Sequence, residues 1–233
     1  MKKSSILFST TLSLLLFVGC GGGSSTPTQK KVTVAQALLG PLSGAKFKIT
    51  TLDGKRVIAE GITTEGSKTD VNSAGLIQIP QDVKDALTKD LYIVEVTGGK
   101  DIDSNDDNVW DANPIDNRGS LHLVTSGTVL QKGSYKINIL TEIVFESIKD
   151  RFETDTKMQL HKLIAQKANT LLKSADNDGD VNGDGKIDGW DLIAWSPAKD
   201  KSKLKVDYNS DLKPIVDFIH DKQDISNFID NLF

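Results

Sequence analysis

The hydrophobic pattern of this chain changes its period near residue 140, and that change limits the possible folds more than any other feature. Between residues 31 and 140, apolar and polar residues alternate in short runs separated by turn signals, as in half-buried strands. After residue 140, apolar residues recur at spacings of three and four, as on one face of a helix. We therefore expect an α+β chain, with an N-terminal antiparallel β-sandwich at 31–140 followed by a small helical domain at 141–233.

The strand-rich part carries about seven short runs, a number and spacing typical of a sandwich. Asp53-Gly54 stands between two of the runs and predicts a hairpin turn. A short helix is expected at Val83–Thr88. The predicted strands are Val32–Leu38, Ala45–Thr50, Arg56–Ile62, Leu76–Ile79, Leu91–Thr97, Leu121–Thr125 and Tyr135–Leu140.

The helical part contains short amphipathic stripes that must dock on a core, because isolated helices of this length are unstable in water. Ser196-Pro197 should end one of these helices, since the residue before a proline avoids the α region. The predicted helices are Thr141–Phe152, Thr156–Lys173, Asp191–Trp195, Asp211–His220 and Asp224–Phe233.

Between two of these helices, the segment 180–191 predicts a calcium site. Side-chain oxygens fall at loop positions 1, 3, 5, 9 and 12, Gly185 occupies the sharp turn at position 6, and position 7 offers its backbone carbonyl. Ca²⁺ takes about six to eight oxygen ligands, and this spacing supplies them. The competing interpretation is an acidic, glycine-rich surface loop that binds nothing. The predicted ligand residues are Asp180, Asn182, Asp184, Lys186, Asp188 and Asp191.

The same segment, continued to Leu192, resembles an EF-hand and, more closely, the calcium-binding repeat of dockerins, which commonly carry Asp where EF-hands carry Glu, as Asp191 does here. The resemblance implies a helix on each side of the loop and, for dockerins, a cohesin partner. Dockerins normally have two repeats, whereas this sequence has one good copy. A structural calcium clamp is therefore favoured over a calcium sensor or a cohesin-binding module.

A second acidic loop spans 101–117. Its oxygen-bearing residues alternate like calcium ligands, but no glycine stands at the turn and no acid at the twelfth position. A second, irregular calcium site and a solvated loop anchored by Trp110 both fit this pattern. Trp110 would also suit stacking on a ligand. The candidate ligands are Asp101, Asp103, Asn105 and Asp107.

The N-terminus has the layout of an export signal. A basic start, Met1-Lys2-Lys3, precedes a short apolar run, Ile6–Val18, so residues 1–19 are expected to be a signal peptide. The segment Phe17-Val18-Gly19-Cys20 resembles the lipobox of bacterial lipoproteins. The resemblance implies cleavage before Cys20 and thioether lipidation of its sulfur. The segment after this cysteine, through residue 30, is rich in Gly, Ser and Thr, so we expect it to be a flexible linker. The alternative is an ordinary signal peptide with an incidental cysteine, the only one in the chain.

The formal net charge of the chain limits the classes of partner that it can bind. Loss of Lys2 and Lys3 with the signal peptide takes the formal net charge from −4 to −6, which argues against nucleic acid and against electrostatic membrane docking. The membrane partner would then be reached through the lipid on Cys20. Gly21 after that cysteine implies, by the lipoprotein resemblance, a place in the bacterial cell envelope at the outer membrane.

The strand-rich part also has a family resemblance. Gly40–Gly54 followed by Leu91–Gly98 looks like the small transthyretin-like or carboxypeptidase-regulatory-like sandwiches. These serve as accessory, stalk or binding modules in exported bacterial proteins, so the resemblance implies a protein or glycan partner.

Catalytic motifs are missing from the sequence: it has no HExxH, GxSxG, P-loop or GxGxxG before a helix, and its three histidines are scattered. We expect a protein that is not an enzyme, and each histidine to be exposed or hydrogen-bonded. The favoured function is an exported, lipid-anchored protein with structural calcium. The alternatives are a dockerin-like module linked to polysaccharide degradation, a glycan-binding adhesin and an unrecognised hydrolase. The three histidines are His122, His161 and His220.

Overall fold

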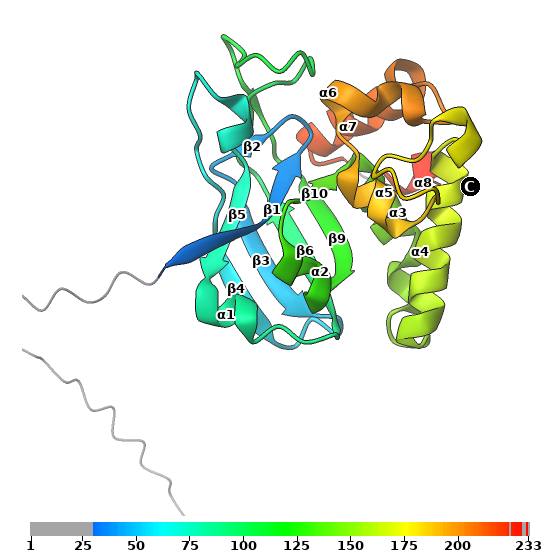
Figure 1. The fold of residues 1–233 in the computed structure, drawn as a ribbon. Helices are drawn as coiled ribbons and strands as arrows, with labels where there is room; N and C mark the ends of the chain where they lie inside the picture. The colour runs from blue at the N-terminus through cyan, green and yellow to red at the C-terminus, as the bar shows by residue number, and fades with distance from the viewer. Residues whose placement is uncertain (1–29, 224, 230–231, 233) are drawn as a thin grey trace, which may run out of the picture.

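The computed structural model describes residues 30–223, 225–229 and 232. The predicted signal peptide, Cys20 and nearly all of the linker lie outside these residues. Helices and antiparallel sheets are both present, which confirms the mixed α+β class. In Figure 1 the strands lie on one side of the molecule and the longer helices on the other.

The largest sheet has four antiparallel strands in the order β4-β3-β6-β9. Val94 pairs with Ile49 on one side and with Leu123 on the other, so all three side chains point to the same buried face. At the β3–β4 turn, Gly54 has φ +67°, which a glycine adopts without strain. The strands are β3 (Lys46–Thr51), β4 (Val57–Ile62), β6 (Leu91–Thr97) and β9 (Ser120–Ser126).

A second sheet has the order β10-β1-β5. It consists of β1 (Lys31–Leu38), β5 (Leu76–Pro80) and β10 (Tyr135–Asn138). β1 pairs with β5 antiparallel but with β10 parallel, so the prediction of an antiparallel module is wrong at this pair. Alternation of apolar and polar residues identifies a strand but does not show whether it pairs parallel or antiparallel with its neighbour. Here α2 (Gly127–Lys132) turns the chain between β9 and β10, and β10 then runs alongside β1.

Three two-residue strands form a small third sheet in the order β2-β7-β8. They are β2 (Leu42–Ser43), β7 (Lys100–Asp101) and β8 (Ile115–Asp116). Strands this short carry no alternation for a sequence pattern to reveal. The β7–β8 pair closes the base of the acidic loop predicted at 101–117.

The predicted helices are present in the predicted order with shifted ends, whereas α2 and the helix that begins at Pro197 were not predicted. The helix expected at Val83–Thr88 begins earlier, directly after Pro80. Pro197 ends one helix, as predicted, but also opens the next, because its fixed φ suits the first helical turn. The helices are α1 (Gln81–Asp85), α3 (Ile139–Ile148), α4 (Lys157–Leu171), α5 (Gly189–Ala194), α6 (Pro197–Asp200), α7 (Lys213–His220) and α8 (Ser226–Ile229), with a π-helical turn at Tyr208–Leu212 before α7.

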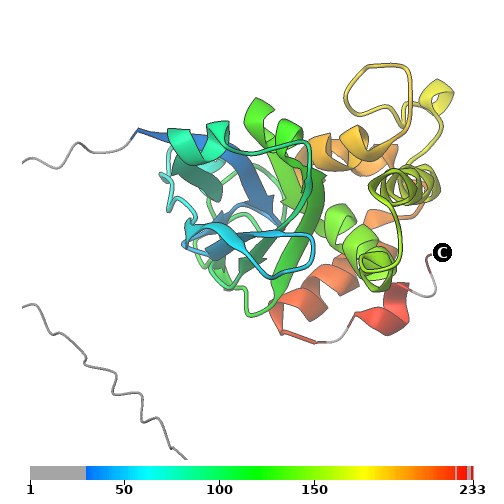
Figure 2. The same cartoon turned by 90° about the horizontal axis from the view of Figure 1, so that it is seen from below.

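One apolar core joins strands and helices. Val94 of β6, Ile137 of β10, Ile143 of α3, Leu171 of α4 and Leu192 of α5 are all buried in the same cluster. Figure 2 shows the helices lying beside the strands rather than apart from them. The division into domains at residue 140 stays a prediction, and the two parts share this core.

Asn138 is the buried polar link between strands and helices. Its Oδ1 accepts the backbone N–H groups of Leu140 and Thr141, at 2.9 and 3.1 Å, and so caps α3. Its Nδ2 donates to the carbonyls of Leu192 and Trp195, at 2.9 and 3.0 Å. One fully buried side chain therefore fixes the end of β10, the start of α3 and the end of α5.

We expect Asn138→Ala to lower the free energy of unfolding by roughly 3 kcal/mol, because it removes a helix cap and leaves buried carbonyls without donors. Urea denaturation measures this change. The exposed Asn209 is the control, and Asn209→Ala should change the same quantity by less than about 0.5 kcal/mol. Equal losses in the two variants would contradict the role given to Asn138.

Candidate functional site

The loop at 180–191 is built around the carboxylate of Asp180. Its Oδ1 accepts the N–H of Gly183 at 2.7 Å and its Oδ2 accepts that of Gly185 at 2.6 Å. The hydrogen bond from Gly185, helped by those from Gly183 and Asp184, lowers the pKa of Asp180. Asp180 is therefore a stable carboxylate facing the inside of the loop.

The next two predicted ligands, Asn182 and Asp184, each accept the N–H of the residue two positions further along the chain. Asn182 Oδ1 accepts the N–H of Asp184 at 2.9 Å, and Asp184 Oδ1 accepts that of Lys186 at 3.0 Å. Gly183 and Gly185 both have φ near +80°, which a residue with a Cβ rarely adopts. The glycines thus allow the loop to curl while Asp180, Asn182 and Asp184 accept N–H groups within it, and Asn182 and Asp184 remain exposed.

Asp191 closes the loop from its far end. It is fully buried, its Oδ1 accepts the N–H of Val181 at 2.8 Å, and its Oδ2 accepts the N–H of Asp188 at 2.8 Å. Asp188 in turn caps α5 by accepting the N–H of Trp190 at 2.8 Å. Burial raises the pKa of Asp191, although the N–H donors oppose the shift. Asp191 thus ties the first residues of the loop to its exit helix.

Neighbouring segments hold the loop on the protein. Asn169 of α4 donates to the carbonyl of Ile187 at 2.9 Å. Lys203 donates to the carbonyl of Asp180 at 2.9 Å and pairs with Asp178 at 3.2 Å. Both sides of the loop are therefore held by neighbouring segments.

The predicted ligand atoms of the loop are all oxygens, which suit a hard cation such as Ca²⁺. In this arrangement the carboxylates accept backbone hydrogen bonds. Across the part of the chain that the structure describes, no group of three or more His, Cys, Asp or Glu side chains is gathered closely enough to hold a metal ion. The calcium site at 180–191 stays a prediction that rests on the sequence spacing and the chemistry of its oxygens.

In the second acidic loop, two of the four candidate ligands turn inward and two outward. Asp101 and Asp103 are buried, whereas Asn105 and Asp107 are exposed and hydrogen-bond to each other at 3.0 Å. Asp103 accepts the N–H of Asp107 at 2.9 Å. Burial raises the pKa of Asp103 to about 6, against the effect of its backbone donors. The structure thus separates these residues into two environments.

Asp101 contacts His220, a residue far along the chain. Its Oδ2 lies 3.1 Å from Nε2 of His220 at the end of α7, and both side chains are buried. The same oxygen accepts the N–H of Gly40 at 3.1 Å. A Cβ on Gly40 would stand 2.3 Å from Asp101 Oδ1, so only glycine allows this approach.

The loop also meets the helical part through two lysines. Lys201 pairs with the buried Asp106 at 2.9 Å, and Lys213 donates to the carbonyl of Ser104 at 2.9 Å. The buried hydroxyl of Tyr208 lies close to Asp106, and burial together with that carboxylate raises its pKa. The loop therefore fastens the strands to the C-terminal helices. Trp110 is half-buried against the small cluster of Val71, Ala74 and Ile102.

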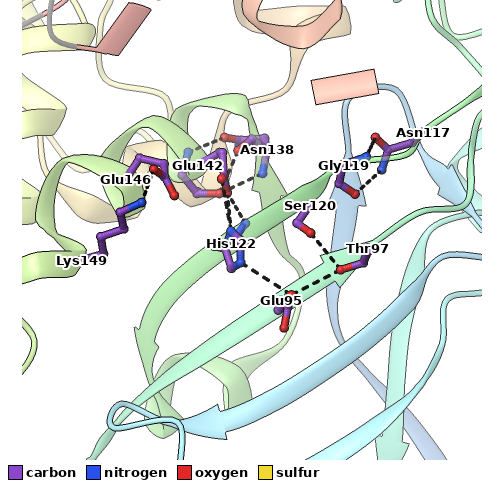
Figure 3. Close-up of polar contacts among 11 residues, drawn as sticks. Glu95, Thr97, Asn117, Gly119, Ser120, His122, Asn138, Glu142, Glu146 and Lys149 are labelled. Carbon is purple, nitrogen blue, oxygen red and sulfur yellow. Dashed lines mark hydrogen bonds and ion pairs between the residues drawn. The ribbon is translucent and has the colours of Figure 1, made fainter. Parts of the chain in front are cut away.

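A third polar centre lies between β9 and α3 and is drawn in Figure 3. His122 Nδ1 lies 2.9 Å from the buried carboxylate of Glu142, and its Nε2 lies 3.9 Å from Glu95. The imidazole stacks on Phe145 with a ring separation of 4.1 Å. Glu146, one turn beyond Glu142 on α3, pairs with Lys149 at 2.6 Å.

The neighbouring carboxylates decide the charge of this histidine. Burial alone would lower the pKa of His122, but the hydrogen bond and charge of Glu142, aided by Glu95 and Glu146, raise it above its ordinary value. Burial raises the pKa of Glu142 in turn, against the effect of His122. Each partner thus depends on the other for its protonation state.

Sequence reasoning missed both buried histidine–carboxylate pairs. His122 and Glu142 stand 20 positions apart, and His220 and Asp101 stand 119 apart. The alternation in β9 places His122 on the face opposite Leu121 and Leu123, and Glu142 lies in the largely apolar first half of α3. A charged residue on such a helix was the available signal. The third histidine, His161, is exposed on α4.

No family model matches the chain, and no curated protein or solved structure matches it either. Within the described residues, no helix combines the length and the apolar character needed to cross a membrane.

The His122 pair makes stability depend on pH. An unfolded histidine has a pKa of about 6.5, and the folded value is higher, so the folded state keeps a proton that the unfolded chain has released. The free energy of unfolding should therefore fall as the pH rises from about 6.5 through the folded pKa of His122.

We expect His122→Gln to flatten this pH dependence, measured by urea denaturation at a series of pH values between about 6 and 9. His161→Gln is the matched control, because that imidazole is exposed. It should leave the slope as in the wild type. An unchanged slope in His122→Gln would show that other groups cause the dependence.

Proposed function

We propose that this chain is an exported, lipid-anchored calcium-binding protein in which the ion is structural. The observation that carries the proposal is that the carboxylates of Asp180 and Asp191, at the two ends of the 180–191 loop, both accept backbone N–H groups of that loop, and that Asp191 is buried. In finer detail, we propose that the loop is EF-hand-like, with α4 as its incoming helix and α5 as its exit helix, and that the strands form a sandwich-type accessory module.

Calcium would act as a clamp. Asp180, Asp184 and Asp188 bring negative charge to one loop, and a divalent cation would offset their mutual repulsion. The loop itself already packs on the common core through half-buried Val181 and Ile187. Binding to the folded state alone stabilises that state by mass action, so the ion would hold α4 and α5 together.

The anchor belongs to residues that the structure does not describe. The proposal places the lipid on Cys20, followed by a Gly- and Ser-containing tether that ends where β1 begins at Lys31. Fully extended, the ten intervening residues would span roughly 35 Å, enough to hold the folded part away from a bilayer. This arrangement fits a protein of the bacterial cell envelope, attached to the outer membrane by its lipid. Protein and glycan partners are both compatible with it.

The calcium proposal predicts a stability gain. For residues 31–233 in calcium at about 100 times Kd, linkage gives about 2.7 kcal/mol, which raises the melting temperature by roughly 5–10 °C over that in EDTA. Asp180→Ala combined with Asp184→Ala should abolish the gain, because two of the proposed carboxylate ligands are lost. Differential scanning calorimetry measures both effects.

The control for this experiment is Asp176→Ala. Asp176 is exposed and lies four positions before Asp180, so the substitution lowers the local acidity without removing a proposed ligand. It should keep the full gain. Equal melting of the wild-type protein in calcium and in EDTA would overturn the proposal.

The anchor has its own test in the full-length chain. Cys20→Ser should abolish incorporation of a labelled fatty acid and move the protein from the membrane fraction to the soluble fraction, because the acceptor sulfur is lost. Ser25→Ala, five residues further along the linker, should change neither result. Labelled, membrane-bound Cys20→Ser protein would rule out lipidation at this residue.

A further inference from the structure

A cavity of about 270 Å³ lies where the end of β9 meets α3, α4 and α5. α5, the exit helix of the 180–191 loop, supplies one of its walls. Gly189 at the start of α5 lets this helix come close to α4, since a Cβ there would stand 2.9 Å from Ile164 Cγ2. The main apolar wall residues are Val124, Val144, Phe145, Ile164, Trp190 and Ile193.

Two of the polar side chains in the wall have hydrogen-bond partners within the protein. The hydroxyl of Thr141 donates to the carbonyl of Asn138 at 2.9 Å, and Asp188 accepts the N–H of Trp190. His161 is exposed, so it lies at the mouth rather than on the floor. No buried charge is left to pair with a charged ligand, and leaving such a ligand unpaired there would be costly. The walls therefore select an uncharged, apolar molecule.

The volume sets the size of that molecule. An apolar protein cavity of about 150 Å³ binds benzene, so a cavity of about 270 Å³ has room for a molecule of roughly two fused rings. Binding pockets are commonly lined by apolar and aromatic side chains with a few polar groups, as this one is. Half-buried Trp190 offers an aromatic surface for such a ligand.

We propose that this cavity is a binding site for a small, uncharged, apolar ligand of about bicyclic size. Because α5 forms a wall of the cavity and also the exit of the 180–191 loop, calcium that orders the loop should tighten ligand binding. By reciprocity the ligand should tighten calcium binding by the same factor. This coupling rests on the proposed calcium function, whereas the cavity does not.

The probe is 1-aminonaphthalene, an uncharged bicyclic amine at neutral pH whose fluorescence responds to an apolar environment. Titration into wild-type residues 31–233 should show saturable binding to one site, in EDTA as well as in calcium. Calcium should lower Kd at least about fivefold, the lower end of common coupling between sites. Ala165→Phe, which fills the cavity from α4, should weaken binding at least tenfold.

Two further variants keep the test decisive. Gln166→Leu adds an apolar side chain next to Ala165 at an exposed position of the same helix, and it should bind as the wild type does. Val129→Phe fills the cavity from α2, so it replaces Ala165→Phe if that variant does not fold. Absence of saturable binding by the wild-type protein, or equal binding by a folded cavity-filling variant, would overturn the site. Binding with the same Kd in calcium and EDTA would overturn the coupling alone.

Discussion

The buried amide of Asn138 holds the architecture together. It stands at the point where the last strand becomes the first long helix. Its oxygen accepts N–H groups at the start of α3, and its two N–H groups donate to carbonyls at the end of α5. A buried amide needs partners for both ends, and these four groups supply them. The position of α5 relative to the sheet therefore follows from one side chain. The loop before α5 and the cavity beside it both depend on that position.

Buried carboxylates perform a related task elsewhere. Asp191 ties a loop to its exit helix, Asp101 reaches His220, and Glu142 reaches His122. A buried carboxylate is tolerated only when hydrogen bonds or a paired charge offset the loss of water. Each of these acids has such partners, and the two histidine pairs join segments from different parts of the chain. The acidic composition thus contributes to the structure as well as to the surface charge.

Calcium binding and apolar ligand binding would meet at α5. One face of this short helix lines the cavity through Trp190 and Ile193, while its first turn carries Asp191 of the loop. Two sites that share one helix can influence each other without a large movement, because each biases how well that helix is ordered.

Local patterns were enough to predict much of the fold. The strand runs were found because side chains alternate along a strand, and α4 was found because its apolar residues follow the helical period. The loop at 180–191 was found in the same way, since its spacing is contained in twelve consecutive residues. In contrast, β2, β7 and β8 are too short for a pattern, and the parallel pairing of β1 with β10 depends on the route of the chain between them.

The sequence by itself determined the longer strands and helices, and which oxygens share a loop, because these properties depend on neighbours along the chain. Only the tertiary structure decided that Asp101 faces His220, that Glu142 faces His122, and that a cavity lies beside α5. Such contacts depend on how separate segments pack, and packing depends on the shapes of all the side chains at once.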